Sequence, residues 1–331
     1  MKIKIEEKVI GGNAPVFVIA EAANSHEGSL EAAKKLVRAA ATAGADAVKF
    51  QKFVVEELLI STHPDFELFK RLELKANEWK ELFAYADELG IIAFADVFDL
   101  SSAAFMASLN VPAYKIHSTD LSNPDLLKYV AAQEKPIFLG IGASYVEEME
   151  QALSFLHEDV VLIHGFQAYP TRLEETNLKF LWTLRERFHR PIGFMDHIDA
   201  NEEFANLLPL VALGFGICLI EKHITLDRSK KGIDHESALN PDEFKRFVLQ
   251  IRKAELAMGS GKNTFFEDEE KYRLKTKKNV VAKRNIKAGE VVTRDMLAFK
   301  RALGGVSPMK AEQLIGQVIS KSMKKDEIFV K

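Results

Sequence analysis

The stretch that decides the fold is residues 16–51, VFVIAEAANSHEGSLEAAKKLVRAAATAGADAVKFQ. It begins with an apolar run at residues 16–20 and ends with a second apolar run at residues 47–50. Between the two runs, Ser29 can cap a helix whose apolar residues recur every three or four positions, and Gly44 can end that helix. Two buried strands joined by an amphipathic helix form one unit of a parallel sheet.

The same alternation of strand and helix recurs along the chain. Asn123 and Asn240 are each followed by Pro and Asp, which is the order of residues at a helix start. Eight apolar runs predict strands that are covered on both faces, at residues 16–20, 47–50, 91–95, 113–116, 136–139, 160–163, 191–194 and 217–220. Eight such units predict a (β/α)₈ TIM barrel over residues 1–262.

A doubly wound open sheet is the structural alternative to the barrel. A dinucleotide-binding sheet of that kind needs a glycine-rich turn after its first strand. Residues 21–29 read EAANSHEGS instead, and the chain has no phosphate-loop spacing elsewhere. The pattern therefore favours the barrel.

The character of the sequence changes after residue 262. Residues 263–278 carry many charges of both signs and predict a linker that is partly helical. Residues 279–331 contain three β-like runs, at 279–292, 298–305 and 318–331, separated by turn signals. They predict a small β-rich C-terminal domain with little core of its own.

Composition excludes several classes of protein. The 331 residues include 45 Lys and Arg against 48 Asp and Glu, so no overall basic field exists and we expect no nucleic acid partner. A single cysteine excludes an internal disulfide framework and is typical of the reducing cytoplasm. Residues 1–12 are too charged for a secretory signal. Residues 204–220 are uncharged, but Pro and Gly interrupt them, which predicts a buried helix and strand rather than a membrane span.

Polar residues follow nearly every expected strand. In a parallel barrel the carboxyl ends of the strands form one rim, where catalytic groups collect. Polar residues also occur at strand ends simply because the chain reaches solvent there. That explanation accounts for one or two polar strand ends, but not for polar residues at nearly every strand end. The set comprises Glu21, Lys49, Gln51, Asp96, Lys115, Ser118, Asp120, His164, Gln167, Asp196, His197, Glu221, Lys222 and His223. The sequence therefore predicts a site at this rim.

Two histidines are candidate metal ligands. His197 and His223 end neighbouring strands, and two imidazoles with few carboxylates suit a divalent cation that keeps open water positions. The alternative is a pair of hydrogen-bonded rim histidines. Cys218 has no argument as a nucleophile beyond its identity.

Two lysines are candidate anion-binding groups. The ammonium groups of Lys49 and Lys115 can bind a phosphate or carboxylate as point charges. They can equally be core lysines that are paired with Glu21 or Asp96, and spacing alone does not decide between these alternatives.

The motifs, taken in order, resemble the sialic acid synthase family, which condenses phosphoenolpyruvate with N-acetylmannosamine or a related 2-acetamido hexose to form nonulosonic acids. The tail resembles the antifreeze-like SAF domain of that family. The motifs are residues 21–51 quoted above, PAYKIHSTD at 112–120, YPT at 169–171, IGFMDH at 192–197, EKHITLD at 221–227, GIDHESALNPDEF at 232–244 and NIKAGEVVTRDMLAFKR at 285–301.

The resemblance implies a metal-dependent barrel enzyme that forms a domain-swapped homodimer. By motif, His197 and His223 would hold Mn²⁺ or Mg²⁺, and the base that activates water would be Asp120. The residues assigned to the substrates are Lys49, Lys115 and Ser118 for phosphoenolpyruvate, Glu21, Tyr169, Asp234 and the partner's Arg301 for the amino-sugar, and Gln51, Asp96, Gln167 and Asp196 at the rim.

The chain departs from the family pattern at the phosphate site. Family hydroxyls are replaced at residues 95–98, which read ADVF, at residues 140–142, which read GIG, and at Met195. Asp96 would repel a phosphate unless it is protonated or paired with a lysine. Two alternatives therefore stay open, which are a metal-dependent aldolase or lyase acting on 2-keto acids and a non-catalytic barrel that binds an acidic sugar.

Overall fold

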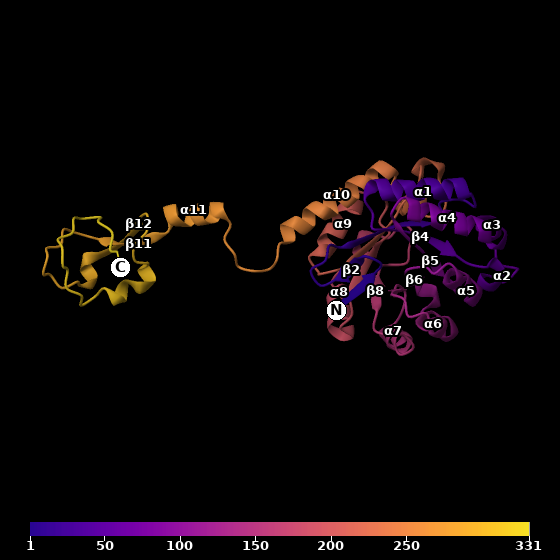
Figure 1. Ribbon diagram of the computed structural model, residues 1–331, viewed down its shortest axis with the longest axis horizontal. Helices are drawn as coiled ribbons and strands as arrows, with labels where there is room; N and C mark the ends of the chain where they lie inside the picture. The colour runs from indigo at the N-terminus through magenta and orange to yellow at the C-terminus, as the bar shows by residue number, and fades with distance from the viewer. Residues whose placement is uncertain (331) are drawn as a thin grey trace. The chain divides into compact units, whose positions relative to one another are not determined.

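The computed structural model describes residues 1–330, and the chain divides into two compact units, Met1–Ser260 and Gly261–Lys331. The first unit is a closed barrel of eight parallel strands, which confirms the predicted fold, and Figure 1 shows helices around these strands. The barrel strands are β3 (Phe17–Ala23), β4 (Ala47–Lys52), β5 (Ile92–Val97), β6 (Tyr114–Ile116), β7 (Ile137–Gly140), β8 (Val160–His164), β9 (Ile192–Asp196) and β10 (Leu219–His223).

Helices connect successive strands and cover the outside of the barrel. Their bounds are α1 (Leu30–Ala43), α2 (Val55–Leu58), α3 (Phe66–Leu72), α4 (Ala76–Glu88), α5 (Leu100–Ser108), α6 (Pro124–Ala131), α7 (Val146–Leu153), α8 (Phe180–Phe188), α9 (Phe204–Leu213) and α10 (Pro241–Met258). Short 3₁₀ turns include η1 (Ser118–Asp120), η2 (Leu173–Glu175), η3 (Arg228–Lys230) and η4 (His235–Ser237). β10 pairs with β3 and closes the barrel.

The first helix begins and ends where the sequence predicts. The Ser29 side chain accepts a hydrogen bond from the amide of Ala32 at 3.3 Å, and Gly44 adopts a left-handed φ of 82°. A residue with a Cβ is strained at that φ, which explains glycine at the helix end. The stretch 204–220 likewise forms α9 and the beginning of β10, and no helix within residues 1–330 is long and apolar enough to cross a membrane.

An N-terminal hairpin that the sequence pattern does not predict lies before the barrel. It consists of β1 (Lys2–Ile5) and β2 (Lys8–Gly11), which pair antiparallel. Its Ile3, Ile5 and Ile10 side chains are buried in one cluster with the inward-facing residues of the barrel strands. Since this cluster includes residues that begin strands, such as Phe17 and Ile92, the hairpin covers the amino end of the barrel.

The second unit has a small core of its own. It contains α11 (Glu267–Thr276), β11 (Lys278–Ala282), η5 (Arg294–Met296), β12 (Leu297–Arg301) and η6 (Pro308–Gln313), with β11 and β12 antiparallel. Val280, Val292 and Phe329 are among the buried side chains. The β-like run at 318–331 pairs with residues 280–292 through three isolated bridges and does not form a continuous strand. Short runs with turns on both sides contribute too few consecutive pairings to extend a ladder.

Candidate active site

The inward-facing side chains of the barrel change from apolar to charged along the strands. Side chains alternate across a strand, so residues two apart share a face. On β4, Ala47 belongs to the interior apolar cluster, which places Lys49 and Gln51 on the same inward face above it. By the same alternation, β5 turns Asp96 inward above Phe94, and β10 turns Glu221 inward above Leu219. The strand ends therefore bring charged groups together at one mouth.

Five buried charged residues form a connected network, here called the acid–lysine cluster: Glu21, Lys49, Asp96, Lys115 and Glu221. The Lys49 ammonium contacts carboxylate oxygens of both Glu21 and Asp96, and it lies 3.5 Å from Glu221. The Lys115 ammonium donates to both oxygens of Glu221, at 3.0 and 3.1 Å, and lies 3.8 Å from Asp96. Asp96 is fully buried and none of the five is more than 4% exposed.

The network fixes the charge of its members. Burial alone would lower the pKa of Lys49, but Asp96 and Glu21 outweigh it and raise that pKa well above its usual value. Burial raises the pKa of Glu21 to about 8, although Lys49 opposes the shift. Burial would also raise the pKa of Glu221, yet Lys115 and Lys49 lower it to about 2. Lys49 is therefore an ammonium group at neutral pH, suited to binding an anion and unsuited to nucleophilic attack.

Two imidazoles lie beside this cluster. The rings of His197 and His223 have centroids 5.4 Å apart, and the Tyr169 ring lies 4.3 Å from the first and 5.8 Å from the second. Burial lowers the pKa of His197 to about 4 and that of His223 well below its usual value. Both rings are therefore neutral at pH 7. His197 Nδ1 donates to the carbonyl of Phe166 at 2.8 Å, so its Nε2 keeps a free lone pair.

The donor chemistry of the imidazole pair fits a divalent cation. Nδ1 of His223 is buried without a hydrogen-bond partner, which is a costly state for a polar atom unless a ligand satisfies it. No group of three or more His, Cys, Asp or Glu side chains among residues 1–330 is arranged to hold a metal ion. The described part of the chain thus offers two imidazoles here, which suits a cation that takes its other ligands from water or substrate.

Further predicted residues lie around the mouth. Ser118 and Asp120 are half-buried on η1, where Asp120 accepts hydrogen bonds from Thr119 and Asn123 at 3.2 Å each. Burial raises the pKa of the Asp120 carboxyl, which makes it a stronger base than an exposed aspartate. At the end of β4, Gln51 accepts a hydrogen bond of 2.6 Å from Asn24.

The loop residues of the site come from the segments after β8 and β10. The Tyr169 hydroxyl donates to Gln167 at 3.2 Å. Burial, with a smaller contribution from nearby Asp234, raises the pKa of that hydroxyl, so it stays a hydrogen-bond donor. Asp234 is half-buried, and burial raises its own pKa.

Two predicted site residues lie outside this group. Asp196 is buried, but it follows inward-facing Met195 on β9 and therefore faces outward, toward the helices. Its Oδ2 pairs with Nζ of Lys222 at 2.6 Å. This pair ties β9 to β10 on the helix-facing side of the barrel wall, where the two residues are register partners. Arg301 is exposed on β12 in the second unit.

The predicted rim set contains Glu221 without a role, and it does not contain Ser237 at all. Glu221 binds both lysines of the cluster, and its position two residues before His223 on one strand was the available signal. Ser237 is fully buried and donates to the carbonyl of His197 at 2.7 Å. No spacing rule connects Ser237 to His197, since 40 residues separate them.

Cys218 is expected to be unreactive. It lies just before β10, half-buried, and its Sγ donates to the carbonyl of Ile192 at 3.4 Å. Burial raises the pKa of this thiol from 9.0 to about 12. Because only the thiolate attacks disulfide reagents, the folded protein at pH 8 should react roughly 10³-fold more slowly than the denatured chain. The rate of labelling by an aromatic disulfide, followed from pH 7 to 10, checks this. Labelling as fast in the folded as in the denatured protein contradicts it.

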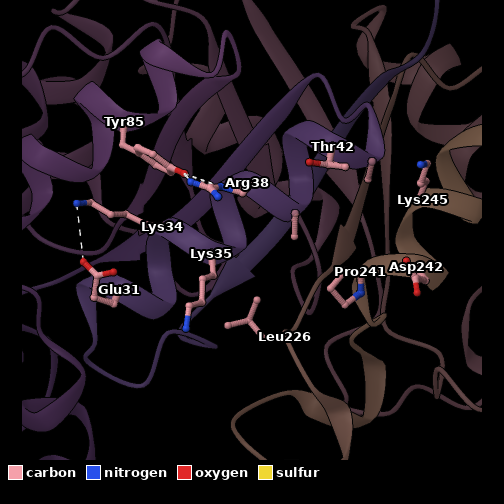
Figure 2. A pocket seen from close by; sticks show the side chains of 12 residues that line it. Glu31, Lys34, Lys35, Arg38, Thr42, Tyr85, Leu226, Pro241, Asp242 and Lys245 are labelled. Atoms are coloured by element: carbon pink, nitrogen blue, oxygen red, sulfur yellow. Dashed lines mark hydrogen bonds and ion pairs between the residues drawn. The ribbon is translucent and has the colours of Figure 1, made fainter.

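A separate cavity of about 740 Å³ lies in the outer helical layer. Figure 2 shows Lys34, Arg38 and Tyr85 at one side of it and Leu226 with Pro241 at another. Lys34 pairs with Glu81 and Glu31, and Arg38 donates to the Tyr85 hydroxyl, so these groups already have partners. None of the strand-end residues lines this cavity. It is therefore distinct from the candidate active site.

Comparisons with known proteins agree with this architecture. The NeuB family model matches residues 36–263, and the SAF domain model matches residues 278–331. The chain is 33% identical to the N,N'-diacetyllegionaminic acid synthase of Campylobacter jejuni, over 94% of this chain and 98% of that protein. It is 31% identical to the human N-acetylneuraminate-9-phosphate synthase, over 96% of this chain and 92% of that protein.

A solved structure gives the same result in three dimensions. The N-acetylneuraminic acid (sialic acid) synthetase of Leptospira borgpetersenii, solved in complex with citrate, superposes with a TM-score of 0.77 at 32% identity. The match covers 82% of this chain and 96% of that one. With a family model that spans more than half of the sequence and relatives matched over nearly their whole length, the chain belongs to the NeuB family of sialic acid synthases.

Proposed function

We propose that this protein condenses phosphoenolpyruvate with N-acetylmannosamine or a related 2-acetamido hexose, forming a nonulosonic acid and releasing phosphate. The observation that carries the proposal is the acid–lysine cluster beside two neutral imidazoles at one barrel mouth. Such a mouth offers ammonium groups for an anionic donor and imidazole ligands for a divalent cation, Mn²⁺ or Mg²⁺. Relatives with synthase activity in their names support the same reaction.

In the proposed reaction, C3 of phosphoenolpyruvate attacks the aldehyde carbon of the open-chain sugar, and positive charge develops at C2. Water then adds to C2, and the tetrahedral product loses inorganic phosphate. A divalent cation held by His197 and His223 would supply Lewis acidity toward the aldehyde oxygen. Asp120 takes the proton that the attacking water releases. The Lys49 and Lys115 ammonium groups hold the donor and stabilise the phosphate as it leaves.

Glu21, Tyr169 and Asp234 are the proposed binding groups for the acceptor sugar at the barrel mouth. Oε1 of Glu21 is buried without a partner, whereas Oε2 contacts the Lys49 ammonium, so Oε1 is the oxygen available to a sugar hydroxyl. Tyr169 and Asp234 add a ring face and a second carboxylate. Holding donor and acceptor in register supplies a large part of the rate in a two-substrate reaction.

The direct test mixes the protein with Mn²⁺, phosphoenolpyruvate and a panel of 2-acetamido hexoses and measures inorganic phosphate. Phosphate release that requires both substrates is the expected result. An absence of release with every sugar contradicts the proposal. Turnover with pyruvate in place of phosphoenolpyruvate would favour an aldolase, although a protonated Lys49 argues against a Schiff base at that lysine.

We also propose that the active unit is a domain-swapped homodimer in which Arg301 of one subunit serves the barrel of the other. An Arg301→Ala chain co-expressed with a His223→Ala chain should then recover activity, since one site in each mixed dimer is intact. Random pairing puts the recovery at about a quarter of the wild-type activity. Phosphate release by the purified mixture is the measurement. If each arm serves its own barrel, every site carries one defect and no activity returns.

A further inference from the structure

Asp96 occupies a central place in the acid–lysine cluster. It is fully buried on β5, one oxygen contacts the Lys49 ammonium, and the other lies 3.8 Å from the Lys115 ammonium. That second oxygen, Oδ1, has no hydrogen-bond partner. Asp96 is therefore bound to both lysines of the proposed phosphate site without being saturated by them.

Asp96 lies on the side of the mouth where the proposed donor binds. Its register partner across the strands is Lys115, and β6 runs from Lys115 into the η1 turn that carries Ser118. By contrast, Glu221 is satisfied by two hydrogen bonds from Lys115 and shares a strand with His223. A phosphate group that reached both lysines would thus lie next to the Asp96 carboxylate.

The cluster offers an incoming anion no surplus of positive charge. Its two ammonium groups face the carboxylates of Asp96 and Glu221, and they also face Glu21, whose pKa of about 8 leaves it mostly uncharged at neutral pH. An incoming phosphate must compete with Asp96 for the same ammonium protons and must also tolerate a like charge at contact distance. Such a repulsion in a buried site changes affinity by more than tenfold even at an effective dielectric of about 20.

We propose that Asp96 is a specificity-determining residue that competes with the phosphate group for Lys49 and Lys115, weakening the binding of the phosphorylated donor and of the phosphate product. The part of the inference that concerns phosphoenolpyruvate rests on the proposed function. The part that concerns inorganic phosphate does not, because Asp96 would compete with any phosphate group at these two lysines. Its consequence is a site that holds the phosphorylated donor loosely and releases phosphate readily.

The experiment compares the full-length wild type with Asp96→Asn, which keeps the shape of the side chain and removes its charge. Titration calorimetry measures the affinity of each protein for phosphoenolpyruvate and for inorganic phosphate. We expect Asp96→Asn to bind both at least about tenfold more tightly. In an active protein it should also lower the KM for phosphoenolpyruvate and increase inhibition by phosphate. Asp87→Asn, which removes one charge from an exposed position on α4, is the matched control and should change neither affinity.

A second variant, Asp96→Ser, keeps the test decisive if the asparagine variant folds poorly. Inorganic phosphate should raise the melting temperature of a folded Asp96 variant more than that of the wild type. Equal or weaker phosphate binding by both Asp96 variants overturns the inference. If no protein releases phosphate from phosphoenolpyruvate but the Asp96 variants still bind inorganic phosphate more tightly, the proposed function fails while the role of Asp96 stands.

Discussion

Replacing either His197 or His223 with alanine is expected to lower phosphate release by about 10³-fold or more, because each imidazole supplies half of the protein ligands of the proposed cation site. The two rings lie 5.4 Å apart between centroids, and both are neutral, so each can donate a lone pair. Loss of one ring should also weaken Mn²⁺ binding. Steady-state phosphate release and the free Mn²⁺ signal in electron paramagnetic resonance measure these two effects separately.

The control for the histidine variants is His63→Ala, which removes an exposed imidazole from the loop before α3. It should leave both Mn²⁺ affinity and phosphate release unchanged. Alanine variants of His197 and His223 that keep wild-type activity and Mn²⁺ affinity would contradict the metal role of these two residues. Loss of activity with normal Mn²⁺ affinity would place the metal elsewhere.

Lys49→Met is expected to destabilise the fold by about 3–5 kcal/mol, because it leaves three buried carboxyl groups with Lys115 as their one remaining cationic partner in the cluster. Removal of one member of a buried ion network exposes the full desolvation cost of the others. Thermal unfolding should show a midpoint lower by roughly 10 °C, and phosphate release should be lost with the donor site.

The control for Lys49 is Lys70→Met, which breaks a pair with Glu56 that is about half exposed on both sides. Surface pairs contribute little, so its unfolding free energy should change by less than about 1 kcal/mol. A Lys49→Met protein as stable as the wild type would mean that the buried carboxyl groups of the cluster do not depend on the Lys49 ammonium. In that case the cluster could not act as described.

The elements that the sequence predicted were those whose signals are local. Ser29 caps the start of α1 by a hydrogen bond with a residue three positions away, and Gly44 ends the helix through its own left-handed φ. Both ends of the helix can therefore be predicted from residues 16–51 alone. The barrel strands are buried on both faces, so each one appears in the sequence as a continuous apolar run that predicts a strand without reference to its neighbours. The N-terminal hairpin was missed because MKIKIEEKVIGG mixes charge with isoleucines, and its three buried side chains find their partners only at the end of the closed barrel.

The sequence predicted which strand ends carry the candidate site residues. The fold decided which of these side chains face one another. Asp96 and Asp196 are both buried acids near strand ends, yet one faces the two lysines inside the barrel and the other pairs with Lys222 outside it. One residue of difference in strand phase separates these outcomes. A sequence pattern that places each strand to within one or two residues cannot resolve that phase.

The sequence by itself determined the barrel, the order of its polar residues and the family to which its motifs point. The tertiary structure alone decided that Lys115 binds Glu221 across 106 residues of chain and that Asp96 lies between two lysines. The physical reason is that secondary structure depends on neighbours in sequence, whereas a buried charge finds its partner through strand register and barrel closure. Those two features bring together the ends of strands that the chain itself keeps far apart.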